Sequence, residues 1–526
     1  MKKLLSLTLA AIMSLSLLSG CSNPADTGKD ETGKKESTTV QQPKEPAKFT
    51  WMTSENTTVQ PIKPDLLVLK ELEKRCNVKI EWQPVPDANY KEKLKIVIAS
   101  GELPDVITLL YGVTVKDLNM MGDNGQLADY TKMLDKLPNI KKVFDNVTGL
   151  KAMYTSNNNK IYCIPAVNEE KGLSSVNRED LIYRKDMFDK AGITKLPTTN
   201  EELLVTLREL KAKLGFPPVL VDTVTKLTDL FSERFDANFM NYDFDKQELR
   251  FNAVSEERKK LLQRANLVVK EGLVDPDFVA MNRSQLNEKK IGNKFALTKG
   301  QLSWADNDTV EGKKNNPDFD LQILGRMKND DGSIKVHTPN NPIVYWDGGI
   351  VSSKAKNQEA IFKTFDFIFS PEGQELLHWG VEGVTFTKDA SGKKVPKPEA
   401  TGSARGTFGM GLNALNQLRD STYGEASWKP LERAWREKAF KEGRVNTKHT
   451  SDITIVENIM TQEEVDVRLQ YFTPLVEYIK AQEAKFIIGQ RSFDTWEAYR
   501  KELKDLGSDK IYEIYKAGFK RLYNIK

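Results

Sequence analysis

The sequence predicts an α/β fold built in more than one lobe, and three observations lead to this prediction. The chain has 526 residues, well above the roughly 250–300 residues at which a single hydrophobic core stops growing. Stretches with the alternating pattern of strands are interleaved with stretches of helical periodicity, which is the order that builds a parallel sheet flanked by helices. The final hundred or so residues show mainly helical periodicity.

The chain begins with a short apolar segment that we interpret as an export signal. Lys2 and Lys3 precede the apolar run Leu4–Leu18. This run has the length of a secretory signal and is shorter than the roughly 20 residues that a membrane-spanning helix needs. We therefore expect residues 1–20 to be a signal peptide and not part of the fold. The run ends at Cys21.

A polar segment separates this signal from the first predicted strand. Residues 22–48 read SNPADTGKDETGKKESTTVQQPKEPAK, which contains no aromatic residue and is rich in Lys, Glu, Thr and Pro. Such a segment buries too little apolar surface to offset the entropy lost on ordering. We expect residues 21–47 to form a flexible tether.

The first α/β stretch predicts strand, helix, strand, helix and strand in turn. Its first strand begins at Lys48, with Phe49 and Trp51 on one face, and its last follows Pro104 as an apolar run typical of a parallel strand buried on both faces. The five segments are Lys48–Ser54, Leu66–Cys76, Asn77–Val85, Tyr90–Ser100 and Gly101–Leu110.

A second α/β stretch begins near Tyr162. Thr199 and Glu202 have the spacing of a capping box, so we expect a helix to begin there. Its buried face would carry leucines at helical spacing, namely Leu203, Leu207, Leu210 and Leu214.

Two later segments extend this pattern. A strand is expected in Gly348–Ala355, and the following helix, Asn357–Phe369, would bury Ile361, Phe365 and Ile368. Near the C-terminus a helix is expected to begin at Asp494 and to bury Trp496, Tyr499, Leu503 and Leu506.

Composition excludes several classes of function. The formal net charge is only +4, from 78 basic and 74 acidic residues, so no nucleic-acid partner is expected. The three histidines are scattered, the acidic run 243–251 lacks the spacing of an EF-hand, and no GxxxxGK[ST] motif occurs. We expect no metal and no cofactor. Cys76 and Cys163 are either two isolated thiols or one disulfide bond.

Short motifs in the sequence resemble those of two known classes of protein. Leu18-Ser19-Gly20-Cys21 resembles the lipobox of bacterial lipoproteins, in which the cysteine becomes the first mature residue and carries acyl chains such as palmitate. Stretches in a fixed order from Phe49 onward resemble the carbohydrate-type extracellular solute-binding proteins of ABC importers, family 1. They are ASGELPDVI, KIYCIPAV, LIYRKDMFDKAGITKLPTTNEEL, VVKEGLVDPD, LTKGQLSWADND, SPEGQELLHWGVEGVTF and AKFIIGQRSFDTWEAYRKEL, the last two being similar to the large subgroup associated with oligosaccharide uptake.

The family resemblance implies a two-lobed periplasmic-binding-protein-like fold of class II type, hinged, with parallel-rich sheets, flanking helices and a mainly helical C-terminus. One lobe would comprise residues 48–163 and about 344–415, and the other 164–343 and about 416–526. The implied partners are an oligosaccharide, the transmembrane subunits of an ABC permease, and the cell membrane through the lipid on Cys21. We expect a monomer at the extracytoplasmic face that is not an enzyme.

Sugar sites combine aromatic rings, which stack on C–H faces, with planar polar side chains that bond to hydroxyls. Under the resemblance, Trp304 with the neighbouring Asp306, Asn307 and Asp308 is the leading candidate cluster. The other candidates lie near predicted strand ends or a lobe crossing: Asp105, Tyr111, Tyr345, Trp346, Asp347, Glu55 and Asn56. Each has a structural alternative, for instance Trp304 as a core residue and Asp105 as a turn cap. Arg184, Asp186 and Glu382 are expected to be structural.

Two rival functions remain open at this point. One is a surface enzyme that degrades polysaccharides, which would need a pair of carboxylates across the scissile bond. The other is a lipoprotein that binds a peptide or serves a sensory receptor, since a peptide site also uses aromatic side chains.

Overall fold

The computed structural model describes residues 45–523 except for 58–59, 169–171, 177, 232–238, 244–246, 293, 331, 333–342, 345–346, 420–421, 423–424, 427, 445–449 and 458. Residues Pro46–Lys526 form one compact unit. Cys21 and the predicted signal and tether up to residue 44 lie outside the described residues, as do Tyr345 and Trp346. Among the helices described, none is long and apolar enough to cross a membrane.

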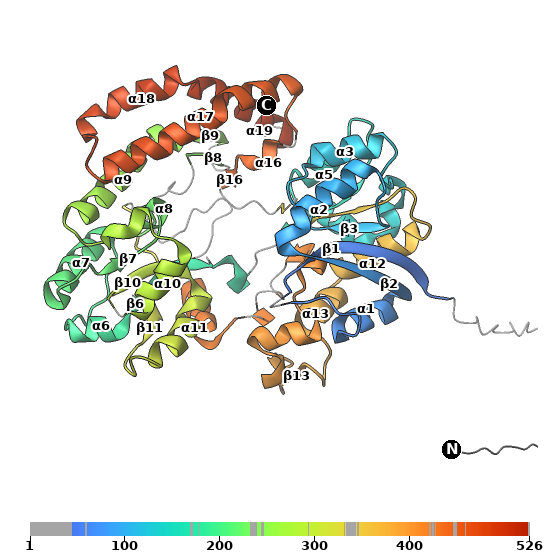
Figure 1. Cartoon of the computed structure of the whole chain (residues 1–526), viewed down its shortest axis with the longest axis horizontal. Helices are drawn as coiled ribbons and strands as arrows, with labels where there is room; N and C mark the ends of the chain where they lie inside the picture. Colours follow the sequence, from blue (N-terminus) through green and yellow to red (C-terminus); the bar gives the residue numbers. More distant parts are fainter. Residues whose placement is uncertain are drawn as a thin grey trace, which may run out of the picture. The chain divides into compact units, whose positions relative to one another are not determined.

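A five-stranded sheet organises the N-terminal half (Figure 1). Its order is β2-β1-β3-β12-β4, with β1 parallel to β2 and β3, whereas β12 is antiparallel to both neighbours. The strands are β1 (Ala47–Glu55), β2 (Val78–Pro86), β3 (Val106–Thr108), β4 (Cys163–Ile164) and β12 (Gly349–Val351). The parallel arrangement of β1, β2 and β3 confirms the predicted succession of strands.

Apolar side chains bury most of β1 and all of β3 and β12, whereas buried and exposed residues alternate at the start of the edge strand β2. Trp51 is fully buried and stacks on Trp82, with ring centroids 5.1 Å apart, and its ring centroid lies 4.9 Å from that of Phe365. Phe365 belongs to α12 (Gln358–Phe369), whose Ile361 and Ile368 are also fully buried, as predicted. The covering helices include α1 (Leu67–Cys76), α2 (Asp87–Ser100), α3 (Val115–Asp123), α4 (Pro138–Asn146), α5 (Leu150–Tyr154) and α13 (Pro371–Trp379).

A second sheet, of four strands in the order β11-β6-β10-β7, forms from the middle of the chain. The strands are β6 (Glu179–Arg184), β7 (Val219–Leu220), β10 (Leu297–Gln301) and β11 (Leu321–Ile323). Only β7 and β10 are parallel, while β6 is antiparallel to β10 and β11. The expectation of parallel-rich sheets is therefore wrong for this sheet. The cause is that β10 and β11 run back along β6, an arrangement that short sequence patterns do not encode.

Helices surround this second sheet, and a separate small apolar core forms beneath part of it. Figure 1 shows α6 (Lys185–Lys190), α10 (Arg283–Ile291) and α11 (Leu302–Lys313) near its strands. The others are α7 (Asn200–Leu214), α8 (Val224–Thr228), α9 (Glu256–Lys270) and α15 (Pro430–Lys441).

The C-terminal region is mainly helical, as predicted, but it also supports a small antiparallel sheet of order β16-β8-β9. The strands are β8 (Met240–Asp243), β9 (Glu248–Phe251) and β16 (Thr450–Asp452). The helices are α16 (Thr454–Glu457), α17 (Gln462–Ile487), α18 (Trp496–Asp505) and α19 (Ser508–Tyr523).

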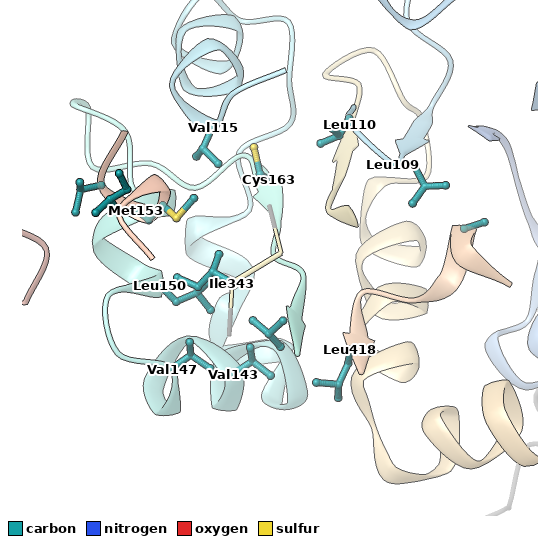
Figure 2. Packing of buried hydrophobic residues seen from close by; sticks show 14 of the residues in the cluster. Leu109, Leu110, Val115, Val143, Val147, Leu150, Met153, Cys163, Ile343 and Leu418 are labelled. Atoms are coloured by element: carbon teal, nitrogen blue, oxygen red, sulfur yellow. The ribbon is translucent and has the colours of Figure 1, made fainter. Parts of the chain in front are cut away.

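Three segments that connect the two large sheets run side by side. β5 (Val167–Asn168) pairs in parallel with β15 (Leu418–Arg419), and Val167 also forms a bridge with Ile343. Ile343 and Leu418 both belong to one cluster of buried apolar residues (Figure 2). Segments distant in sequence thus meet where the chain leaves one sheet for the other.

Several local details differ from the sequence prediction, among them Leu214 and Leu506, which are predicted to be buried but are half-buried. Thr199 caps α7 as predicted, yet the Glu202 carboxylate accepts from the backbone N–H and hydroxyl of Thr198, so a reciprocal capping box does not form. The helix expected from Asp494 begins as a short 3₁₀ turn and becomes α-helical only at Trp496.

The structure also answers the question left open about the cysteines. Cys76 and Cys163 are both free thiols. Burial raises the pKa of Cys76 to about 11 and that of the fully buried Cys163 further still, so both thiols stay protonated at neutral pH.

Candidate functional site

The carboxyl ends of β1, β2 and β3 bring several polar side chains to one edge of the first sheet. Ser54 lies near the end of β1, Asp87 directly follows β2, and Tyr111 lies three residues after β3. The Ser54 hydroxyl donates a hydrogen bond to the Asp87 carboxylate. The carboxyl ends of parallel strands are where open α/β sheets bind small molecules.

A strained turn follows β3 at this edge. Leu109 has a φ of +65°, a conformation that a non-glycine residue rarely adopts and that costs about 1–3 kcal/mol. Its N–H donates to the carbonyl of Gly348, and its carbonyl accepts from Tyr111 N–H. The side chains of Leu109 and Leu110 are both buried and anchor the turn (Figure 2). The buried leucines and the backbone bonds together hold Tyr111 in place.

Asp347 reaches the same edge from the segment that leads into β12. Its side chain is buried and accepts a 2.6 Å hydrogen bond from Nη2 of Arg419 on β15. The backbone carbonyl of Asp347 accepts from Nε2 of the fully buried Gln417. Burial raises the pKa of the Asp347 carboxyl, and the Arg419 guanidinium opposes that rise.

Tyr111 lies within electrostatic range of these charged groups. It is half-buried, and its ring meets that of Tyr90 edge-on at a centroid distance of 6.0 Å. Burial raises the pKa of the Tyr111 hydroxyl, the nearby carboxylates of Asp347 and Asp87 raise it further, and Arg419 lowers it. Tyr111, Asp87, Asp347 and Arg419 therefore form one cluster, which we call the first-sheet cluster.

Trp304 lies in the first turn of α11, which begins where β10 ends in the second sheet. Its indole packs directly against Gly300 of β10, since a Cβ at Gly300 would lie 2.2 Å from Cε3 of the ring. The ammonium of Lys290 lies 4.5 Å from the ring centroid and that of Lys226 lies 5.7 Å from it. Trp304 is half-buried and packs against the smaller apolar core, so it combines a core contact with a partly exposed ring.

The lysines around Trp304 belong to ion pairs. Nζ of Lys290 lies 2.8 Å from Asp308, and Nζ of Lys226 lies 2.6 Å from Asp222. In the strand before Trp304, the buried Lys299 bonds to the buried Asp229. We call these three pairs with Trp304 the second-sheet cluster.

The structure assigns local contacts to the other polar residues near Trp304. The Asp306 carboxylate accepts from the backbone N–H groups of Leu431 and Glu432, both at 3.3 Å, and so caps the start of α15. The exposed Asn307 accepts from Lys429. Trp304, Asp306 and Asn307 are thus close in sequence but contact different neighbours.

The remaining sequence candidates lie at separate places. Asp105 precedes β3, at the opposite end of that strand from Tyr111, and its carboxylate accepts from the N–H and hydroxyl of Thr50. Glu55 accepts from Ile62 N–H at 2.8 Å, and Asn56 forms a bridge with Gln60.

Sequence reasoning missed two residues of the first-sheet cluster, Asp87 and Arg419. The sequence does carry a signal for Asp87, because it is the first charged residue after the predicted strand Asn77–Val85. The sequence carries no such signal for Arg419. Its position depends on the pairing of β15 with β5, two segments that are distant in sequence.

Arg184 and Asp186 have the structural role expected of them. Arg184 is fully buried, donates two hydrogen bonds to Asp186 at 2.8 and 2.6 Å, and lies 3.9 Å from the ring centroid of Phe319. Within the part of the chain that the structure describes, His, Cys, Asp and Glu side chains do not gather into a group of three able to hold a metal ion.

Comparison with known protein families decides the class to which this arrangement belongs. Residues 60–375 match the model of the bacterial extracellular solute-binding protein family. The chain belongs to this family. The match covers more than half of the sequence and includes both the first-sheet residues Asp87, Tyr111 and Asp347 and the second-sheet residue Trp304. The predicted family resemblance is confirmed.

Individual relatives agree with this assignment. The chain is 24% identical, over 86% of its length and 87% of the relative, to the fructooligosaccharide ABC transporter substrate-binding protein FusA of Streptococcus pneumoniae. It is also 24% identical, over 70% of its length and 73% of the relative, to the polygalacturonan/rhamnogalacturonan-binding protein YtcQ of Bacillus subtilis.

A solved structure confirms the fold class. The structure of the Streptococcus pneumoniae protein FusA in complex with kestose superposes with a TM-score of 0.67 at 21% identity, and it covers 91% of this chain and all of that one. The fold is the predicted two-lobed, periplasmic-binding-protein-like one.

Proposed function

We propose that this protein is the lipid-anchored substrate-binding component of an ABC importer, that it binds an oligosaccharide without breaking any bond in it, and that it delivers the sugar to a membrane permease. The observation that carries the proposal is the first-sheet cluster in a chain of this family. A half-buried tyrosine ring, two carboxylates and a guanidinium meet at the carboxyl ends of parallel strands, which is the set of groups that a sugar needs.

The proposed lobes follow the two large sheets. One would comprise residues 48–163 and about 344–415 and contain β1, β2, β3, β4 and β12. The other would comprise 164–343 and about 416–526 and contain β6, β7, β10 and β11. We propose that the segments around Val167, Ile343 and Leu418 act as the hinge, since they pair with one another where the chain passes between the sheets.

The sugar would bind between the lobes and contact both clusters. Tyr111 and Asp347 would act from the first lobe and Trp304 from the second. Tyr345 and Trp346, which directly precede Asp347 in the sequence, remain proposed sugar contacts from the sequence alone. Five other candidates already bond to neighbouring parts of the protein, namely Asp105, Glu55, Asn56, Asp306 and Asn307. We propose direct contact with the sugar for them only as a secondary role.

Anchoring is proposed from the sequence alone. Cys21 follows a signal-like segment and would carry the lipid at the extracytoplasmic face. Replacing Cys21 by Ala should move the protein from the membrane fraction to the medium. If the variant and the wild type fractionate alike, the anchor at Cys21 is excluded.

The central experiment titrates the chain after its signal, carrying Cys21→Ala, with a panel of oligosaccharides while tryptophan fluorescence is followed. The same mixtures are then assayed for released reducing ends. Saturable binding without products supports the proposal, whereas products would show an enzyme. A response to peptides and to no glycan would favour a peptide receptor.

A further inference from the structure

We infer that the binding site binds uncharged oligosaccharides more tightly than those that carry carboxylates. Asp347 causes this preference, because its carboxylate already forms an ion pair with Arg419. The inference rests on the proposed function, and it narrows the ligand to a chemical class. It also separates this chain from the relative named for binding polygalacturonan, a polymer of acidic sugars.

The first-sheet cluster carries more acid than base. Its charged members are the carboxylates of Asp87 and Asp347 and the guanidinium of Arg419. Arg419 is committed to Asp347 by a 2.6 Å bond, in which the carboxylate side chain is only 4% exposed and the arginine side chain 22% exposed. The guanidinium that a sugar carboxylate would meet in this cluster is thus shared with a buried aspartate.

The second-sheet cluster leads to the same conclusion. The three lysines that lie around Trp304 or in the strand before it, Lys226, Lys290 and Lys299, each have a carboxylate partner. All three are largely buried, with side chains 20%, 8% and 6% exposed. Their charges are therefore neutralised within the protein before any ligand arrives.

A sugar hydroxyl and a sugar carboxylate interact differently with an ion pair of the protein. A hydroxyl can donate to the carboxylate and accept from the cation, so a neutral sugar gains from both members of an ion pair. A sugar carboxylate would be brought next to the protein carboxylate, and such like-charge contacts at an interface are strongly unfavourable. Breaking the pair instead would leave the buried aspartate without its partner.

The arrangement predicts a gain of function. In the variant Asp347→Asn, the amide keeps the size of the side chain but removes its charge, and the half-buried Arg419 loses its bond to this carboxylate. A carboxylate on the ligand could then supply the missing charge, with the paired, charge-assisted hydrogen bonds that guanidinium groups make to carboxylates.

The experiment compares acidic with neutral ligands, and trigalacturonic acid and its methyl ester form the pair that is most closely matched apart from charge. Trigalacturonic acid, its methyl ester and a panel of neutral trisaccharides including kestose are titrated by calorimetry into the wild type, Asp347→Asn and Glu483→Gln. Glu483 is the matched control, because it forms a buried bidentate pair with Arg258 between α9 and α17 (side chains 8% and 13% exposed) and lies in neither cluster. Circular dichroism and melting curves check that each variant is folded.

We expect the wild type to bind at least one neutral ligand about a hundredfold more tightly than any acidic one. Asp347→Asn should raise the affinity for trigalacturonic acid about tenfold or more in low salt, an increase that added salt reduces, while Glu483→Gln should not. Tighter binding of trigalacturonic acid than of its methyl ester and the neutral panel by the wild type would overturn the inference and leave the proposed function intact. No binding of any sugar would overturn both.

Discussion

The six-membered ring of Trp304 lies against the backbone of Gly300, four residues earlier, with no side chain between them. A Cβ atom at position 300 would lie 2.2 Å from Cε3 and 2.4 Å from Cζ3 of the indole. The glycine therefore sets how closely the ring approaches β10, and Lys290 at 4.5 Å from the ring centroid holds it from another side.

Replacing Trp304 by Ala should weaken oligosaccharide binding by about 1–3 kcal/mol, the range typical of a lost aromatic anchor. Calorimetric titration with the best ligand of the panel measures this. Trp428, which is also flanked by cationic side chains, provides a matched substitution outside both clusters. Unchanged affinity of Trp304→Ala would remove this residue from the proposed site.

Replacing Gly300 by Ala should weaken binding although the indole is retained, because the new methyl group forces the ring to move. The double variant Gly300→Ala/Trp304→Ala should then bind no more weakly than Trp304→Ala alone, a non-additivity that a double-mutant cycle measures. Additive losses would show that Gly300 acts independently of the ring.

Replacing Tyr111 by Phe should weaken binding by about 0.5–1.5 kcal/mol, the net value of one hydrogen bond. Since burial and two carboxylates raise the pKa of the Tyr111 hydroxyl, the affinity should not fall between pH 7 and pH 9 through ionisation of this group. The control is Tyr478→Phe, whose hydroxyl bonds to Glu502 on another helix. Equal effects of the two variants on affinity would argue against a contact by Tyr111.

Replacing Asp186 by Ala should destabilise the fold by about 3–5 kcal/mol, because the fully buried Arg184 loses its bidentate partner. Urea unfolding measures the change. The exposed pair of Glu359 and Lys363 on α12 is the control, and Glu359→Gln should change the free energy of unfolding by at most about 1 kcal/mol. A comparably small effect of Asp186→Ala would contradict the structural role.

His378 should make stability depend on pH. Burial lowers its pKa to about 3, against 6.5 for an exposed histidine. Below pH 6.5 the unfolded chain therefore binds a proton that the folded chain does not, and the free energy of unfolding falls as the pH falls. Between pH 6.5 and pH 5 the slope due to this group approaches about 1.4 kcal/mol per pH unit.

The substitution His378→Gln tests this dependence. The variant should be less stable at pH 7 but should show a flatter profile between pH 6.5 and pH 5 in urea unfolding. Parallel profiles for the variant and the wild type would assign the dependence to other groups.

The sequence predicted those parts of the fold that depend on neighbours along the chain. Phe49 and Trp51 identified β1, the apolar run after Pro104 identified β3, and the spacing of Ile361, Phe365 and Ile368 identified α12. The prediction failed where strand direction depends on pairing between segments distant in sequence, as for the antiparallel partners of β6. For the site, it named Tyr111, Asp347 and Trp304, but it also named Asp105, which lies at the opposite end of β3 and bonds to Thr50.

The sequence by itself determined the α/β succession and the family, because apolar periodicity and short motifs are local properties. Only the tertiary structure decided that Asp347 meets Arg419, 72 positions later, and that Lys290 and Gly300 enclose Trp304. Charges and rings pair through space, and their distances are set by strand pairing and chain crossings that no short stretch of sequence encodes. The electrostatic character of the proposed site is therefore a property of the fold.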